Sequence, residues 1–325
     1  MDKTYKIEIS ARTIVFTVFF ILGLQLLWMV KELIFSLLIA FILMSALNPW
    51  VMALSKKRIP RGISAIVIFV ALIFLLGYLF SWIIPPVVQQ TTQLFQNLPY
   101  LITNLNPNLS QYFALDYWSK NIPSLTNNAF VFLREVFSNL ILVISILFFS
   151  LYLLIEEDAI KKFILRFVNK KDIRRFANTV DQAERKMRSW FWGEAILMLA
   201  IGILTFIGLS LIGVRYALPL AIIAGLLEIV PILGPVLSAI PAFIVASASS
   251  YFLGLATIAL YFIVQQIENQ IVVPLVMKKA VGLNPIVTLA ALITGGTLLG
   301  FLGILLAIPI TLLIEVVIAE FFSQR

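Results

Sequence analysis

The chain of 325 residues contains no cysteine and no histidine. Disulfides and thiolate chemistry are therefore excluded, as are the common zinc and haem sites and the Cys/His or Ser/His catalytic arrangements. Charged residues are also scarce, at 12% of the chain, against about 25% in a typical soluble protein. Neither G-x-x-x-x-G-K-[ST] nor G-x-G-x-x-G occurs, so no nucleotide-phosphate loop is expected. We expect no catalytic residue, no cofactor and no resident metal.

Apolar residues make up 61% of the chain, and the mean hydropathy is +1.04. Several runs reach or approach the roughly 20 residues that cross a bilayer as a helix, and the alternation of a β-barrel is missing. We therefore predict an all-α polytopic membrane protein with up to eight membrane segments. Two of these, Tyr216–Ser249 and Asn284–Phe322, are interrupted. The six expected full spans are Thr13–Val30, Leu33–Leu54, Ile63–Ile84, Phe137–Ile155, Trp190–Gly213 and Phe252–Pro274.

The net charge of +8 comes from loops beside the spans, which favours a role in topology over nucleic-acid binding. No signal-peptide cleavage pattern follows the first apolar run. If the N-terminus is cytoplasmic and Tyr216–Ser249 returns to its own side, 20 of the 24 basic residues face the cytoplasm. A single crossing of that run would instead place Lys278 and Lys279 outside. We favour the re-entrant arrangement, with both termini cytoplasmic in a prokaryotic inner membrane.

The chain divides into four regions. Residues 1–84 form an N-terminal three-helix membrane region. Residues 85–136 are expected outside the membrane as amphipathic helices, lying on its surface or against partner subunits, or as an ordered linker. Residues 137–189 hold the fourth span and a basic cytoplasmic arm, which could serve as a connector, a gate or an anionic-lipid contact. Residues 190–325 form a transport core with two interrupted helix units.

The first interruption is the stretch Glu228-Ile-Val-Pro-Ile-Leu-Gly-Pro235. Each flanking half has at most 14 residues, so each reaches only about 21 Å as helix, against a hydrocarbon core of about 30 Å. A helix that stops halfway across the membrane and carries an acid is typical of a transport site. The alternative is a kinked packing helix. The residues expected to act here are Glu228, Pro231, Gly234 and the break residue Pro235.

A second polar stretch, Gln265-Gln-Ile-Glu-Asn-Gln270, lies inside an otherwise apolar span and is followed by Pro274. Helical spacing places Gln265, Glu268 and Asn269 on one face. These side chains could bind a cation or a polyol, or they could join helices through hydrogen bonds.

The second interrupted run begins at Asn284 and contains the break residues Gly295, Gly296, Gly300 and Pro309. We expect the interruption at Thr294–Thr297. The two interrupted runs, each beside a full span, resemble two copies of one unit. In repeat transporters of this design, the substrate site lies where the breaks meet.

These motifs resemble, in order and spacing, those of the autoinducer-2 exporter family, a family of permeases. The resemblance rests on the stretch Glu228–Pro235, on Gln266-Ile-Glu268-Asn269, on Leu283-Asn284-Pro285 and on Gly300–Pro309, and it covers nearly the whole chain. It implies a homo-oligomer, pentameric in form, that moves its substrate by an elevator-like displacement. It implies export of autoinducer-2 in some members and Na⁺(Li⁺)/H⁺ antiport in others.

We therefore predict a secondary transporter that moves a small polar solute across the inner membrane, with a Na⁺(Li⁺)/H⁺ antiporter and a non-transporting scaffold as the first and second alternatives. An exporter of a small polar solute would use Gln265, Glu268, Asn269 and backbone groups. An antiporter would use Glu228 or Glu268 as a site that alternates between a proton and a monovalent cation such as Na⁺. A non-transporting oligomeric scaffold would use the polar spans only for assembly. The expected partners are copies of the same chain, the bilayer and the solute or cation. Glu194, Glu315 and Glu320 are expected near membrane boundaries.

Overall fold

The computed structural model describes residues 11–105, 140–156, 161–162, 173–231, 233–277 and 283–322, and within these ranges it contains helices and no strand. The prediction of an all-α polytopic membrane protein is confirmed. Five helices are long and apolar enough to cross a membrane: Lys31–Ser55, Arg61–Gln90, Ile173–Leu211, Tyr251–Val276 and Leu302–Glu320.

The N-terminal half contains α1 (Ala11–Met29), α2 (Lys31–Ser55), α3 (Arg61–Leu105) and α6 (Leu140–Ile155). The side chains of α2, α3 and α6 share one apolar core. That core contains Met44, Leu47, Val51, Ala65, Phe69 and Leu154.

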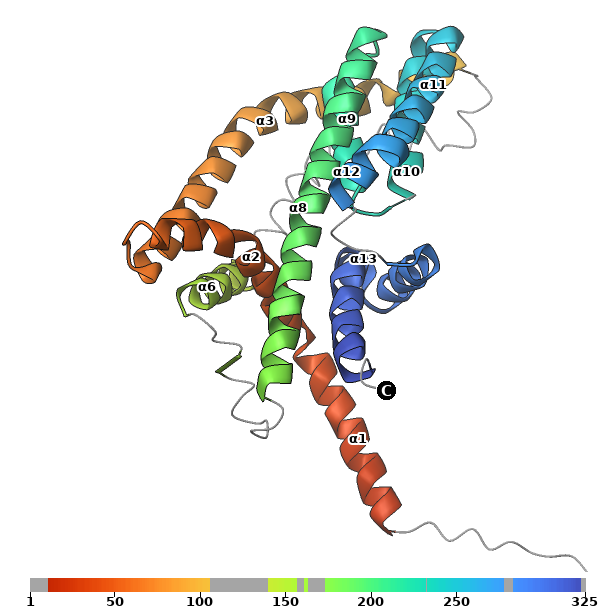
Figure 1. Cartoon of the computed structure of the whole chain (residues 1–325). Helices are drawn as coiled ribbons and strands as arrows, with labels where there is room; N and C mark the ends of the chain where they lie inside the picture. Colours follow the sequence, from red (N-terminus) through yellow and green to blue (C-terminus); the bar gives the residue numbers. More distant parts are fainter. Residues whose placement is uncertain are drawn as a thin grey trace, which may run out of the picture.

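Helix α3 continues well beyond the expected end of its span at Ile84. Two prolines, Pro85 and Pro86, do not stop it, and it reaches Leu105. Figure 1 shows it arching from the α2 end of the molecule toward α9 and α10, and it contacts both. The Asn97 amide donates a hydrogen bond to the Tyr216 hydroxyl at 3.0 Å. The first part of region 85–136 therefore covers the start of α9, and residues 106–136 lie outside the described ranges.

The C-terminal half contains α8 (Ile173–Leu211), α9 (Ala217–Leu227), α10 (Leu233–Ser249), α11 (Tyr251–Ile267), the π-helical turn η1 (Glu268–Val272), α12 (Val273–Met277) and α13 (Pro285–Phe322). Helix α8 contains both the end of the expected basic arm and the expected span that follows it. Its later turns pack with α9, α10 and α11 around a second apolar core. That core includes Ile201, Leu209, Leu220, Ala224, Ala242, Val245, Tyr261 and Val264.

Helices α9 and α10 form a hairpin around the predicted break. The Gly234 N–H donates to the Val230 carbonyl at 2.9 Å, and a Cβ at Gly234 would overlap the Leu227 carbonyl oxygen. Only glycine leaves room for this approach. Helix α9 also lies very close to α8, because a Cβ at Gly225 would sit 2.7 Å from the Met198 carbonyl oxygen. Small residues on α9 thus allow backbone-to-backbone packing.

The second interruption lies at Gly300, later than the expected Thr294–Thr297. The helix continues through Gly295 and Gly296, and Gly300 alone leaves helical geometry, with φ 62° and ψ −140°. After it the chain folds back, since the backbone of Gly303 lies against that of Gly295. A glycine pair can remain helical, whereas the left-handed conformation at Gly300 favours glycine for steric reasons.

Candidate functional site

Three glutamates from three elements converge in the C-terminal half. Glu194 lies on α8, Glu228 ends α9, and Glu268 begins the π-helical turn. Their relative exposures are 5%, 3% and 6%, so all three are buried. The carboxyl groups of Glu228 and Glu268 lie within hydrogen-bonding reach of each other, and Glu194 is near enough to both for electrostatic repulsion. We call these three residues the carboxyl cluster.

The break in the first hairpin positions Glu228. Its N–H still donates to the Ala224 carbonyl at 3.1 Å, so the residue completes the last turn of α9. Pro231 in the following turn has no N–H, and helix geometry resumes only at Leu233. A proline at this point interrupts the helical hydrogen bonds. The side chain of Glu228 is thus held where two half-helices meet.

The π-helical turn positions Glu268. The Val273 N–H donates to the Glu268 carbonyl, five residues earlier, and Pro274 follows directly. Proline in a helix clashes with the carbonyl four residues before it, and one wide turn relieves that clash. The Gln265 amide donates a 3.1 Å hydrogen bond to one carboxylate oxygen of Glu268. Single π-turns of this kind are frequent at functional sites.

The cluster has few polar partners of its own. Within the described residues, neither Glu228 nor Glu268 forms an ion pair with a basic side chain, and one oxygen each of Glu194 and Glu228 has no hydrogen-bond partner. Tyr261, also buried, lies two helical turns from Glu268 on the same face of α11. Buried carboxyl groups without cationic partners are costly, which is typical of groups that bind a ligand.

The other predicted residues take different positions. Pro231 lies in the turn and Gly234 packs beneath it, whereas Asn269 is exposed, away from the buried face of Glu268. The wide π-turn gives a physical reason, because the i+4 spacing from Gln265 no longer holds through it. Asn284 caps α13, since its side-chain oxygen accepts the Ile286 N–H at 2.9 Å.

Glu194 is the one residue of the carboxyl cluster that was not predicted from the sequence to lie in a functional site. It was expected at a membrane boundary, yet it is buried beside Glu228 and Glu268. The available signal was an acidic residue followed by the apolar run of a span, which is unusual in a membrane helix. Among the described residues, no group of three or more carboxylates is arranged to hold a metal ion.

Comparison with known proteins supports a transport role. The sequence pattern of the family described as AI-2E family transporter matches residues 14–323. The chain is 30% identical to YueF of Bacillus subtilis over 307 residues, which cover 86% of this chain and 82% of YueF. It is 24% identical to YrrI of the same organism, covering 96% and 94% of the two chains. It is 26% identical to YhhT of Escherichia coli, covering 86% and 82%. All three relatives carry names that describe candidate transport proteins.

Proposed function

The chain belongs to the AI-2E transporter family, and from that premise we propose that it is a secondary transporter whose carboxyl cluster binds the translocated or coupling ion. The observation that carries the proposal is the buried pair Glu228 and Glu268, held side by side without a basic partner in the described residues. Two like charges this close repel strongly in a medium of low dielectric. A proton or a monovalent cation between them removes the repulsion.

Exchange of Na⁺ or Li⁺ for a proton is the simplest cycle that such a pair performs. The cation binds both carboxylates together, and protons replace it when it leaves. Binding of the two is mutually exclusive because each neutralises the same charge. No nucleotide site is expected in this sequence, so an ion gradient would supply the energy.

Movement is proposed to occur at the two hairpins. The α9–α10 hairpin carries Glu228, and it packs on α8 through small residues that present smooth backbone surfaces. Such a surface favours sliding over deep interdigitation. We propose an elevator-like displacement of the hairpins, which would carry the cluster from one side of the membrane to the other.

Export of a small polar solute, with autoinducer-2 as the example suggested by the family, is the second candidate. The Gln265 amide beside Glu268 favours it, because a donor and an acceptor side by side suit hydroxyl groups. We propose that the protein works as a homo-oligomer in the inner membrane, with both termini in the cytoplasm.

Everted vesicles with a pH-sensitive dye test the main proposal. Adding Na⁺ or Li⁺ to energised vesicles that contain the full chain should release protons, and K⁺ serves as the comparison ion. Glu228→Gln and Glu268→Gln should each abolish the response, because the site then lacks one charge. Glu32→Gln is the matched control, since Glu32 is an exposed acid on α2.

Three outcomes distinguish the candidates. A response lost in both cluster variants and kept in the control supports ion exchange. No response in the wild type, with solute efflux that depends on Glu268, supports the export candidate instead. If both cluster variants transport normally and only the oligomer dissociates, the scaffold function replaces the transport site.

A further inference from the structure

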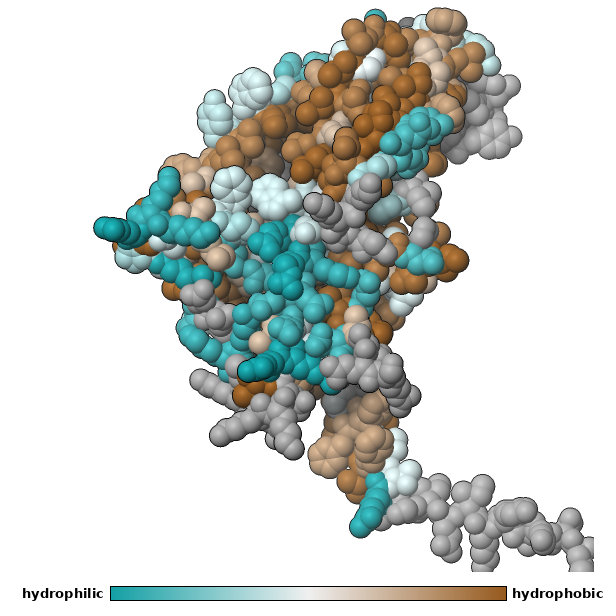
Figure 2. All heavy atoms as spheres, viewed as in Figure 1, coloured by the Kyte–Doolittle hydropathy of each residue, from teal (hydrophilic) through white to brown (hydrophobic). Residues whose placement is uncertain are grey.

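A second polar site lies away from the carboxyl cluster, among α2, α3, α6 and α8. Here the structure contains a cavity of about 420 Å³. Its charged lining residues are Arg61, Glu156, Lys161, Asp181, Glu184, Arg185 and Arg188. Figure 2 shows hydrophilic side chains gathered over the region where these helices meet. The volume is within the range of small-ligand sites, which is about 300–1,000 Å³.

The acidic residues of this cavity already have partners. Lys161 pairs with Asp181 at 2.7 Å. Glu184 accepts a 2.6 Å hydrogen bond from the Asn48 amide, whose oxygen accepts one from Arg61 at 3.1 Å. These three acidic or amide groups are therefore satisfied by the walls of the cavity.

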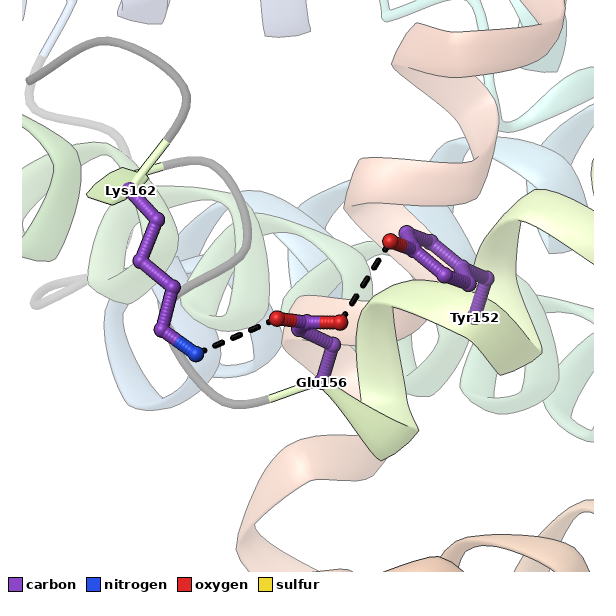
Figure 3. A network of polar contacts seen from close by, with 3 residues as sticks. All are labelled: Tyr152, Glu156 and Lys162. Carbon is purple, nitrogen blue, oxygen red and sulfur yellow. Dashed lines mark hydrogen bonds and ion pairs between the residues drawn. The ribbon is translucent and has the colours of Figure 1, made fainter. Parts of the chain in front are cut away.

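Glu156 is paired in the same way. Its carboxylate bonds to Lys162 at 3.1 Å and accepts a longer bond from the Tyr152 hydroxyl (Figure 3). The hydrogen bond and charge of Lys162 hold the pKa of Glu156 below its usual value. Glu156 is thus charged at neutral pH, and the cation that balances it lies outside the cavity lining.

The two arginines that α8 contributes to the cavity have no such partner among the described residues. Arg185 and Arg188 are three residues apart, which places them on one face of the helix. Within the described ranges, neither forms an ion pair or a hydrogen bond. Arg188 is half-buried and Arg185 is exposed, so together they reach from the interior of the cavity to its mouth.

Two tryptophans place the cavity at the edge of the apolar region. Trp192 lies one turn after Arg188 and donates a 3.1 Å bond to the Ala46 carbonyl of α2, and Trp50 follows Asn48 on α2. Both rings are partly exposed to the surroundings of the protein. Tryptophan is enriched at the level of lipid headgroups.

We propose that this cavity binds a phosphate group through Arg185 and Arg188. Guanidinium groups recognise phosphate oxygens with paired, planar hydrogen bonds. Two sources supply this chemistry, the headgroup of an anionic phospholipid and free phosphate in solution. The bound group would occupy the cavity beside α2 and α6 while it is held by α8, at a site separate from the carboxyl cluster.

The test uses the purified full chain in detergent micelles and measures its melting temperature. We compare phosphatidylglycerol with phosphatidylcholine, and inorganic phosphate with chloride at equal ionic strength. The variant R185Q/R188Q removes both arginines of the proposed site. The variant K56Q/K57Q is the matched control, because it removes two exposed positive charges from the turn after α2 without changing the cavity lining.

The wild type should be stabilised by phosphatidylglycerol or by phosphate. The concentration needed should rise about tenfold or more in R185Q/R188Q, given the typical contribution of a basic residue near anionic lipid, and stay unchanged in K56Q/K57Q. A response to phosphatidylglycerol alone identifies the headgroup, and a response to phosphate identifies the soluble ion. The proposal is overturned if the wild type responds to neither, or if both variants respond alike. If R185Q/R188Q does not fold, native mass spectrometry compares the single variant R188K with the wild type. Phosphate should displace bound phosphatidylglycerol more readily from R188K, and equal displacement from the two proteins overturns the proposal.

Discussion

Glu194 acts on the proposed ion site from a distance. It touches neither Glu228 nor Glu268 through a hydrogen bond, but its charge is close enough to affect both. A third negative charge strengthens the attraction of the pair for a cation.

We therefore expect Glu194→Gln to weaken cation binding without abolishing transport. Loss of about 1 kcal/mol of attraction raises the half-saturating Na⁺ concentration roughly fivefold, while the maximal rate changes little. Initial rates over a range of Na⁺ concentrations in proteoliposomes measure both quantities. Glu194→Asp keeps the charge and is the control. An unchanged Na⁺ dependence in Glu194→Gln would show that the cation does not sense this residue.

Part of the candidate site could be predicted from the sequence. Glu228 and Glu268 are recognisable because acids are rare in apolar helices, and Gln265 because it precedes Glu268 by one turn. The position of Asn269 was not predicted, because Pro274 alone does not show whether the helix accommodates it by a kink or by a π-turn that changes the spacing. The burial of Glu194 depends on how α8, α9 and α11 pack, which no local pattern encodes.

The hairpin in α13 depends on the close contact between the backbones of Gly295 and Gly303. A Cβ at Gly303 would overlap the Gly295 carbonyl group, and backbone cannot move aside as a side chain can. We expect Gly303→Ala to destabilise the protein by about 1–3 kcal/mol, the usual range for overpacking. Thermal melting followed by size-exclusion chromatography measures the loss. Gly77→Ala is the control, because a Cβ there meets no atom within 4 Å. Equal melting temperatures for the two variants would contradict the hairpin packing.

The proposed re-entrant course of α9 and α10 can be tested with single cysteines, since the chain has none of its own. Arg215 precedes α9, Ser250 follows α10, and both are exposed. A membrane-impermeant thiol reagent should label Arg215→Cys and Ser250→Cys from the outer side of the membrane. Lys57→Cys, in the turn after α2, should react only from the cytoplasmic side. Labelling of positions 215 and 250 from opposite sides would mean that the run crosses once.

The sequence predicted which segments are helical more accurately than it predicted where those helices end. Length and composition located the spans, because the bilayer requires about 20 apolar residues whatever the neighbours are. The third span was expected to end at Ile84 and to be followed by separate amphipathic helices, whereas α3 continues through Pro85 and Pro86 and packs over α9 and α10. The break at Gly300 was placed several residues early, because four glycines lie close together and only packing selects one of them for the turn.

The whole molecule exposes a large apolar surface, as a membrane protein must. Among the described residues, helix α1 is the clearest case, because it meets the rest of the chain mainly at α2 and projects from the body (Figure 1). Most of its described side chains are exposed, with Phe16 at 70% and Phe19 at 69%. Lipid covers such a helix without selecting any one face. A neighbouring copy of the chain would select a face, since packing is a main source of helix association in a bilayer.

Because α1 packs against little of its own chain, we expect it to lie between subunits of the proposed homo-oligomer. Native mass spectrometry of the full chain should give one main species, and a pentamer would have about five times the 36.5 kDa chain mass. Phe16→Ala with Phe19→Ala should weaken the oligomer by about thirtyfold or more on dilution, because truncation of aromatic anchors weakens an interface by about 1 kcal/mol or more each. Phe74→Ala with Phe80→Ala is the control, since these phenylalanines are similarly exposed on α3. If both pairs leave the oligomer intact, α1 contacts lipid and another surface joins the subunits. If the control pair alone dissociates it, α3 forms the interface.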